Sequence, residues 1–228
     1  MTPAAVAIVL AGGSGERLGE RVPKAFVGVG GRPMLVHAAL AALACPAIRS
    51  VVVAAPEGFE DLALAMLEGV GTHAVVTGGA TRQGSVRAAL EAVPPDTGVI
   101  VCHDAARPFA RPELFVAVLD ALEEADGAVP VLPISDTVKR VRHGLVLGTE
   151  PREELALAQT PQAFVASALR EAHRRATEGG VDLTDDAALL EWAGFRVRAV
   201  AGDPDNFKIT TPDDLARAEL HAGELARG

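Results

Sequence analysis

Short runs rich in valine and isoleucine alternate along this chain with alanine- and leucine-rich segments of helical period. Strands buried on both faces give continuous apolar runs, and their alternation with helices is typical of a mainly parallel sheet covered on both sides. The sequence therefore predicts an α/β fold, a mainly parallel sheet flanked by helices. The strands are expected at 5–10, 50–55, 73–78, 98–103, 127–132 and 196–200. The helices are expected at 33–44, 57–68, 81–92, 111–124, 165–178, 185–193 and 212–223.

The alternation is interrupted over residues 135–160, "SDTVKRVRHGLVLGTEPREELALAQT". Here "TVKRV", a His-Gly turn and "LVLGT" predict a protruding β-hairpin arm. An arm with exposed edges and apolar side chains is commonly buried against the same arm of a second copy. We therefore expect residues 1–228 to form one domain, with 135–160 as a dimerisation arm of a homodimer.

Composition excludes several classes of partner. The formal charge of −9 and the pI near 5.2 argue against broad contact with nucleic acid or an anionic membrane. The cysteines, Cys45 and Cys102, lie in apolar contexts without CxxC spacing, which predicts core packing rather than a disulfide framework or zinc site. The apolar N-terminal run has no Lys or Arg ahead of it and is too short to span a bilayer, so a cytoplasmic location is expected.

The loop after the first predicted strand reads "LAGGSGERLGERVPKAF". Its glycines let backbone amides approach phosphate oxygens, and Arg17 and Lys24 can add positive charge. Ligands of open α/β sheets bind at this carboxyl edge. The alternative is a glycine turn with solvated cations. A P-loop and a dinucleotide fingerprint both fail on spacing, because no Gly-Lys pair follows and Leu18 occupies the third glycine position.

The stretch from Leu10 to Lys24 resembles the nucleotidyltransferase pattern LAGG-x-G-x-R-(L/M)-G followed by PK. "VCHDAARPF" (101–109) then resembles the HDAARP segment of the 2-C-methyl-D-erythritol 4-phosphate cytidylyltransferase family. Further matching pieces follow in family order over nearly the whole chain. These are "GGATRQGSV" (78–86), "SDTVKR" (135–140), "QTPQAF" (159–164), "LTDDAALLEWAG" (183–194) and "DNFKITTPDDL" (205–215).

The resemblance implies a Rossmann-like fold of the nucleotide-diphospho-sugar transferase type and transfer of a cytidylyl group from CTP to methylerythritol phosphate, with release of pyrophosphate. A phosphomonoester is already mostly dianionic at neutral pH, so the reaction needs cations, backbone amides and Mg²⁺ rather than an enzyme nucleophile. Arg17, Lys24 and Lys208 are the expected catalytic cations. Asp104, at a strand end, is the expected Mg²⁺ ligand, although a lone Asp there is often a cap.

The resemblance also implies the binding residues. For the nucleotide these are Ala11, Gly12, Gly13, Ser14, Gly15, Gly79, Ser85 and Asp104. For the polyol phosphate they are Arg107, Thr137, Arg152, Thr160 and Thr184. Without the resemblance, Thr184 is an N-cap and Arg152 a surface cation, and His103 is interpreted as structural. Ala80 departs from the family pattern, in which relatives often carry an acid, so one base or loop contact is in question.

Three other functions stay open at this point. A ribitol 5-phosphate cytidylyltransferase shares the first loop and much of the HDA-x-RP segment, although "HDAARP" favours methylerythritol phosphate. A catalytically silent nucleotide-binding regulator could use the same scaffold, but the presence of Arg17, Lys24, Asp104 and Lys208 argues against it. A nicotinamide-dependent dehydrogenase is disfavoured by the missing glycine fingerprint.

Overall fold

The computed structural model describes residues 4–13 and 22–227. Within them, eight strands form one mixed sheet in the order β10-β7-β11-β6-β1-β4-β5, with β12 also paired to β7. The strands are β1 (Ala5–Leu10), β4 (Ile48–Ala55), β5 (Thr72–Thr77), β6 (Val99–Asp104), β7 (Gly127–Pro133), β10 (Ala156–Ala158), β11 (Gln162–Val165) and β12 (Val197–Ala201). Neighbours in the block β6-β1-β4-β5 are parallel, as are β7 and β12, whereas β10 and β11 run antiparallel to their neighbours.

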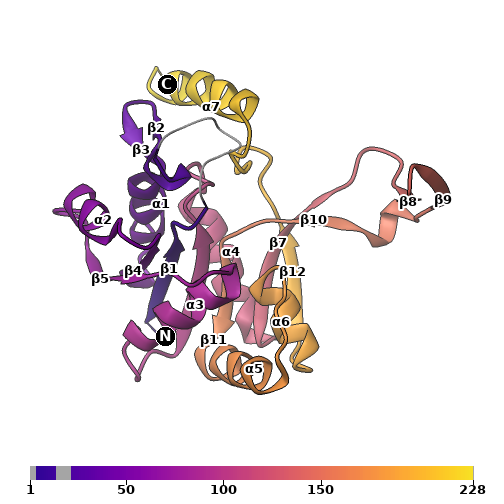
Figure 1. The fold of residues 1–228 in the computed structure, drawn as a ribbon, viewed down its shortest axis with the longest axis horizontal. Coiled ribbons are helices and arrows are strands. Elements are labelled where there is room, and N and C mark those ends of the chain that lie inside the picture. Colours follow the sequence, from indigo (N-terminus) through magenta and orange to yellow (C-terminus); the bar gives the residue numbers. More distant parts are fainter. Residues whose placement is uncertain (1–3, 14–21, 228) are drawn as a thin grey trace.

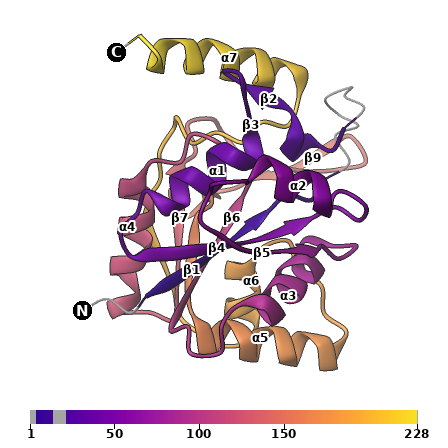
Figure 2. The same cartoon turned by 90° about the vertical axis from the view of Figure 1, so that its left-hand side faces the viewer.

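Helices cover both faces of the sheet, as the alternating pattern predicts (Figures 1 and 2). One face packs against α1 (Met34–Leu43), α2 (Glu60–Met66) and α4 (Pro112–Asp120), which is followed by a 3-10 turn at Ala121–Glu123. The other face packs against α3 (Arg82–Ala92), α5 (Ala166–Gly179) and α6 (Asp186–Trp192). The predicted α/β fold is confirmed, and each predicted helix is present with ends displaced by a few residues.

The last helix lies outside these two layers. Helix α7 (Pro212–Leu225) packs over the small ladder of β2 (Gly28–Val29) and β3 (Arg32–Pro33), beside the 3-10 turn Lys24–Phe26. Glu219 of α7 accepts a hydrogen bond from the Gly30 amide at 3.1 Å. A Cβ on Gly30 would lie 2.9 Å from the Ala222 Cβ, so the close approach of α7 favours glycine there. Helix α7 therefore rests directly on the segment that follows the first loop.

The predicted hairpin is present as β8 (Lys139–Arg142) and β9 (Leu145–Thr149). His143 and Gly144 form its turn with φ of 48° and 79°, the left-handed conformation that such tight turns require. The hairpin projects from the body of the molecule in Figure 1, and the 3-10 turn Arg152–Glu154 lies on its return path. The segment predicted as the arm also includes part of the main sheet, because Ala156–Ala158 forms its edge strand β10.

Candidate active site

The first loop begins beside Asp104. In the pairing of β1 with β6, Leu10 lies opposite Asp104, and the Ala105 amide donates to the Leu10 carbonyl at 3.0 Å. Ala11 is fully buried and its amide donates to the Ala54 carbonyl at 2.9 Å. The parallel register therefore brings the glycine loop and the "HDAARP" segment to the same carboxyl edge of the sheet, where ligands of such sheets bind.

The described part of the first loop is open. Gly12 and Gly13 are exposed, and Gly13 has a φ of 115°, which favours glycine. The Lys24 amide donates to the Gly13 carbonyl at 3.4 Å, so the chain returns to the start of the loop at Lys24. The predicted residues Ser14, Gly15 and Arg17 lie outside the described residues. Of the predicted catalytic cations of this loop, Lys24 is the one among the described residues, and its backbone lies at the site edge.

A second glycine loop follows β5 at the same edge. The Gly79 amide donates to the Ser85 hydroxyl at 3.1 Å, and that hydroxyl lies 2.9 Å from the Thr81 carbonyl. A Cβ on Gly79 would lie 2.6 Å from the carbonyl carbon of Gly84, which makes glycine necessary. Ser85 is 5% exposed. Its hydroxyl closes the loop onto α3, so in this structure Ser85 shapes the loop from within.

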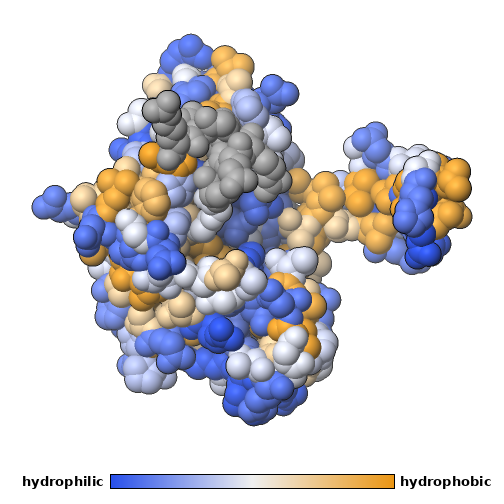
Figure 3. Space-filling model, in the orientation of Figure 1, coloured by the Kyte–Doolittle hydropathy of each residue, from blue (hydrophilic) through white to orange (hydrophobic). Residues whose placement is uncertain are grey.

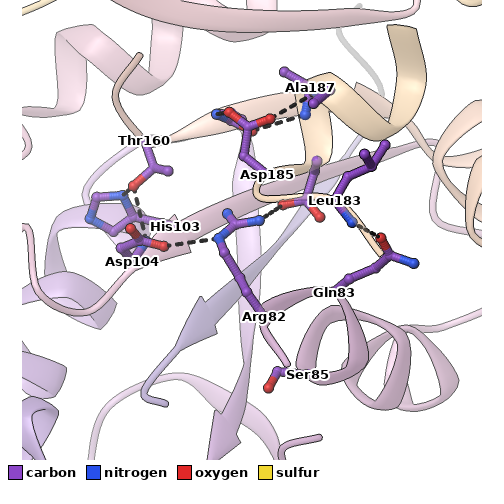
Figure 4. Close-up of polar contacts among 12 residues, drawn as sticks. Arg82, Gln83, Ser85, His103, Asp104, Thr160, Leu183, Asp185 and Ala187 are labelled. Atoms are coloured by element: carbon purple, nitrogen blue, oxygen red, sulfur yellow. Dashed lines mark hydrogen bonds and ion pairs between the residues drawn. The ribbon is translucent and has the colours of Figure 1, made fainter. Parts of the chain in front are cut away.

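Four charged side chains meet at the end of β6, and Figure 4 shows the contact of Arg82 with Asp104. Lys208 donates from Nζ to Asp104 Oδ2 at 2.7 Å, and Arg82 Nε lies 3.4 Å from Asp104 Oδ1. The Nη1 atom of Arg82 lies 2.6 Å from Asp186 Oδ2. Asp104 is thus held by cations from two segments that lie 22 and 104 residues away in sequence. We call Asp104, Lys208, Arg82 and Asp186 the Asp104 cluster.

The Asp104 cluster keeps the central carboxylate ionised. Burial of Asp104 raises its pKa, but the charges of Arg82 and Lys208 outweigh that effect, and the pKa lies well below its usual range. The Lys208 side chain is 42% exposed, whereas the Asp104 side chain is 11% exposed. A carboxylate at the site edge is therefore neutralised by one cation that solvent and ligands can reach, and by a second that is more deeply placed.

A chain of hydrogen bonds fixes the backbone around Asp104. The Asp104 amide donates to the Thr160 hydroxyl at 3.0 Å, which leaves the hydroxyl proton for His103 Nδ1 at 3.1 Å. His103 Nε2 must then carry the ring proton, which it donates to the Arg107 carbonyl at 3.1 Å. Burial lowers the pKa of His103 to about 4, so the ring is neutral. Thr160 and His103 thus support the site from inside the protein.

The guanidinium of Arg107 is also held by the backbone. Its Nη1 donates to the Asn206 carbonyl at 2.8 Å and its Nη2 to the Ala158 carbonyl at 3.3 Å. Burial lowers the pKa of Arg107. Arg107 therefore ties the segment after β6 to the segment that carries Lys208, and a contact with the acceptor phosphate stays a prediction.

The remaining predicted residues lie on the arm or just before α6. Thr137 is exposed at the start of the arm, and Arg152 donates from Nη1 to the Ser135 carbonyl at 2.5 Å on the other side of the arm. Thr184 is exposed beside α6, but it is not the N-cap. Asp185 caps α6, because its side chain accepts from the Ala188 amide at 2.8 Å. The N-cap interpretation of Thr184 is therefore wrong.

Sequence reasoning missed Arg82 and Asp186 as members of the Asp104 cluster. Both stand inside the motifs "GGATRQGSV" and "LTDDAALLEWAG", but an Arg and an Asp in the first turns of two helices are ordinary surface residues by pattern alone. Their pairing depends on how α3 and α6 pack. The sequence feature that could have indicated this pair is the opposite charge of two residues, each at the start of a helix beside the same sheet edge.

In the described part of the chain, no cluster of three or more His, Cys, Asp or Glu side chains could hold a metal ion. Among the described residues, Asp104 offers a carboxylate oxygen, a hard ligand, at the site edge. A single carboxylate suits Mg²⁺ that arrives largely coordinated by phosphate and water. The donor set therefore fits a metal carried by an anionic substrate, and not a metal held by the protein alone. Among the described helices, none is long and apolar enough to cross a membrane.

Comparisons with known proteins agree on one family. The sequence pattern of IspD, 2-C-methyl-D-erythritol 4-phosphate cytidylyltransferase, matches residues 5–224. The chain is 45% identical over 227 residues to the 2-C-methyl-D-erythritol 4-phosphate cytidylyltransferase of Deinococcus radiodurans, covering 100% of this chain and 93% of that protein. It is 44% identical over 214 residues to the bifunctional enzyme IspD/IspF of Granulibacter bethesdensis, covering 93% of this chain. The chain spans 55% of the length of that bifunctional relative.

Solved structures give the same result. The crystal structure of 2-C-methyl-D-erythritol 4-phosphate cytidylyltransferase from Thermus thermophilus superimposes with a TM-score of 0.82 at 37% identity, over 98% of this chain and 100% of that chain. The structure of 4-diphosphocytidyl-2C-methyl-D-erythritol synthase from Anaerococcus prevotii gives a TM-score of 0.86 at 28% identity, with the same coverage of 98% and 100%.

Proposed function

Because this chain belongs to the IspD family, 2-C-methyl-D-erythritol 4-phosphate cytidylyltransferase, we propose that it transfers the cytidylyl group of CTP to 2-C-methyl-D-erythritol 4-phosphate. The products are 4-diphosphocytidyl-2-C-methyl-D-erythritol and pyrophosphate, in non-mevalonate isoprenoid precursor synthesis. The observation that carries the proposal is the meeting of Lys208 and Asp104, 2.7 Å apart, at the sheet edge where the first glycine loop begins.

The chemistry requires charge stabilisation more than proton transfer. One oxygen of the acceptor phosphate attacks the α-phosphorus of CTP, and the bond from that phosphorus to the pyrophosphate oxygen breaks. Negative charge builds on the α-phosphate and on the departing pyrophosphate, so cations placed there accelerate the reaction. In the proposal Lys24 and Arg17 act on the triphosphate, and Lys208 acts on the acceptor phosphate. His103 takes no part, because its ring is buried and both nitrogens are engaged.

The nucleotide is proposed to lie across the two glycine loops. Backbone groups of Ala11, Gly12 and Gly13, with Ser14 and Gly15, bind the base and the phosphates. Gly79 and Ser85 form the other wall, in which the Ser85 hydroxyl holds the loop in shape. The shape of this loop depends on Ser85 and glycine rather than on the side chain at position 80. With Ala80 in place of an acid, the base is therefore proposed to be recognised by main-chain groups.

A divalent cation completes the proposed site. Asp104 would hold Mg²⁺ together with the phosphates of CTP, and the ion when bound neutralises charge on the triphosphate. For Asp104 to serve as a ligand, the Lys208 ammonium must leave Oδ2. Its 42% exposure and flexible side chain allow it to turn towards the acceptor phosphate.

The acceptor is proposed to bind between two copies of the chain. Thr137 and Arg152 lie on the arm, which projects away from the edge that carries Asp104 (Figure 1). The arm exposes 54–69% of the apolar side chains Val141, Leu145, Val146 and Leu147, visible as the apolar surface at its tip in Figure 3. We propose that residues 1–228 form one nucleotidyltransferase domain and dimerise through 135–160. Arg152 and Thr137 then reach the partner's acceptor site, to which Arg107, Thr160 and Thr184 belong.

A product assay tests the proposed function. Purified protein is incubated with CTP, Mg²⁺ and one polyol phosphate at a time, and the nucleotide products and pyrophosphate are quantified. The expected result is a cytidine diphosphate adduct of methylerythritol phosphate, formed in preference to the adduct of ribitol 5-phosphate. Faster turnover of ribitol 5-phosphate would reassign the acceptor. Nucleotide binding without any product would identify a silent regulator.

A further inference from the structure

Arg82 makes an uneven contact with its two carboxylates. Its Nη1 atom lies 2.6 Å from Asp186 Oδ2, whereas its Nε atom lies 3.4 Å from Asp104 Oδ1. Its third nitrogen, Nη2, is buried and has no hydrogen-bond partner among the described residues. The guanidinium is therefore held closely by Asp186 and only loosely by Asp104, although Asp104 lies at the candidate active site.

The unused nitrogen is on the edge of Arg82 that faces Asp104. In a guanidinium, Nε and Nη2 form the side-on fork that binds both oxygens of a carboxylate, and such two-pronged pairs are strong. Here one prong lies 3.4 Å from Oδ1, the second is unused, and Oδ2 is bonded to Lys208 at 2.7 Å. A small movement of Arg82 would convert the loose contact into a two-pronged ion pair that occupies both oxygens of Asp104.

Asp186 is well placed to prevent that movement. Its side chain is 1% exposed and stands at the start of α6, where it holds Arg82 through Nη1, whereas Asp104 lies nearest to Nε. The groups that face it from other elements are Arg82, His173 Nε2 at 3.8 Å, and the Cys102 thiol. Burial lowers the pKa of His173, and burial raises the pKa of Cys102. Both neighbours are thus neutral, and Arg82 is the cation paired with Asp186.

We propose that Asp186 is a positioning residue that holds Arg82 back from Asp104, so that the Asp104 carboxylate stays able to accept a divalent cation. The metal part of this inference rests on the proposed function. Asp186 acts through Arg82 and touches neither substrate. A buried ion pair often adds little net stability. In this proposal, the buried Asp186–Arg82 pair instead serves to keep the Asp104 carboxylate available.

The test measures how much a metal strengthens nucleotide binding, without turnover. Isothermal titration calorimetry gives the Kd of the full chain for CTP in EDTA and in saturating Mn²⁺, with no acceptor present. The ratio of the two Kd values reports the contribution of the metal. For Asp186→Asn, the freed Arg82 competes for Asp104, so we expect this ratio to fall by about tenfold, comparable to the energy of one charged hydrogen bond.

A second substitution separates positioning from simple damage. Arg82→Gln combined with Asp186→Asn removes the competing cation as well, and the ratio should return towards the wild-type value. A merely structural role predicts that the double variant is no better than Asp186→Asn. If Asp186→Asn does not fold, the double variant Arg82→Lys/Asp186→Asn takes its place, because a lysine at position 82 would also be free to approach Asp104. The Kd ratio of this variant should lie below that of Arg82→Gln/Asp186→Asn.

Gln83→Ala is the matched control. Gln83 docks the same segment, donating to the Val181 carbonyl at 2.9 Å and accepting from the Leu183 amide at 3.0 Å, but it does not touch Asp104. Its ratio should match the wild type. An equal fall in Gln83→Ala would show that loosening the segment is enough, and would overturn the inference.

The inference and the proposed function fail differently. If Asp104→Asn keeps the wild-type ratio, Asp104 holds no metal and that part of the proposed function is wrong. The crystal structure of Asp186→Asn then decides the inference by itself. Arg82 Nε and Nη2 should both lie about 3 Å from the Asp104 oxygens. An Arg82 side chain that keeps its wild-type position would overturn the inference.

Discussion

Lys208 and Arg82 both neutralise Asp104, but they differ in what else they can do. The Lys208 side chain is 42% exposed and the Arg82 side chain 22%. Arg82 has a buried second partner in Asp186, whereas the contact of Lys208 within the described residues is with Asp104. Lys208 can therefore move to a substrate phosphate while Arg82 stays, and the charge of Asp104 remains partly balanced throughout.

Lys24 provides a test of transition-state stabilisation. If its ammonium interacts more strongly with the transition state than with bound CTP, Lys24→Met should lower kcat by about 10²-fold while changing CTP affinity less. Steady-state kinetics and CTP titration measure the two effects separately. Lys24→Arg, which keeps the charge, is the control and should retain more activity. An unchanged kcat in Lys24→Met would remove Lys24 from the chemical step.

His103 predicts a pH dependence of stability. Its pKa is lowered by burial to about 4 in the folded protein, from an ordinary value of 6.5. Between pH 6.5 and 4 the unfolded chain therefore binds a proton at His103 that the folded protein does not bind. The contribution of His103 to the free energy of unfolding is fully present above pH 6.5 and is lost as the pH falls towards 4. The loss is up to about 3 kcal/mol. Denaturant unfolding at several pH values should show a shallower decline for His103→Gln. Parallel declines would contradict a neutral buried ring.

At the level of single residues, the sequence motifs predicted Asp104 and Lys208 as site residues, but not the ion pair between them. Asp104 and Lys208 are 104 residues apart, yet each stands in a long motif at a strand end or loop. The internal contacts of Ser85 and Thr160 could not be predicted, because a hydroxyl that faces a ligand and one that closes a loop look the same in sequence. The difference depends on backbone carbonyls that only the folded loop brings near.

Among the elements, the antiparallel strands β10 and β11 escaped prediction. β11 is the four-residue segment "QAFV" between β6 and β7, and β10 is the three-residue segment "ALA". Neither is long enough to show a period of its own, so each takes its conformation from pairing with β7 or β6. The longer strands and the helices were predictable, because their apolar residues form a pattern that extends over several turns of a helix or several residues of a strand.

The capped first turn of helix α7 begins shortly after Lys208 in the chain. The capping box joins Thr211 and Asp214, and Asp214 also accepts from the Thr210 amide at 2.8 Å, two residues after Lys208. Asp214→Ala should lower the free energy of unfolding by about 1–2 kcal/mol, since it removes the reciprocal cap. Chemical denaturation measures the change. The exposed neighbour Asp213 is the matched control, and Asp213→Ala should change stability by less than half as much.

At the scale of the molecule, the arm is hard to explain in a single copy. A two-stranded hairpin is at best marginally stable alone in water, and this one exposes Leu145 by 69% and Val146 by 63%. Its strands β8 and β9 pair only with each other among the described residues. A second copy that covers the apolar tip would stabilise the hairpin and carry Arg152 towards another active site.

Mixing two inactive variants tests this shared site. Lys24 would act in its own chain and Arg152 in the partner's site, so Lys24→Ala and Arg152→Ala each inactivate both sites of a homodimer. In a mixed dimer one site receives both substitutions and the other receives neither. With random pairing half of the dimers are mixed, and half of their sites are intact, so activity should recover to about a quarter of wild type. Native mass spectrometry establishes that the chains have exchanged. If exchange is complete and activity stays absent, Arg152 serves its own chain or no site at all, and the arm is then a dimer contact without a role in acceptor binding.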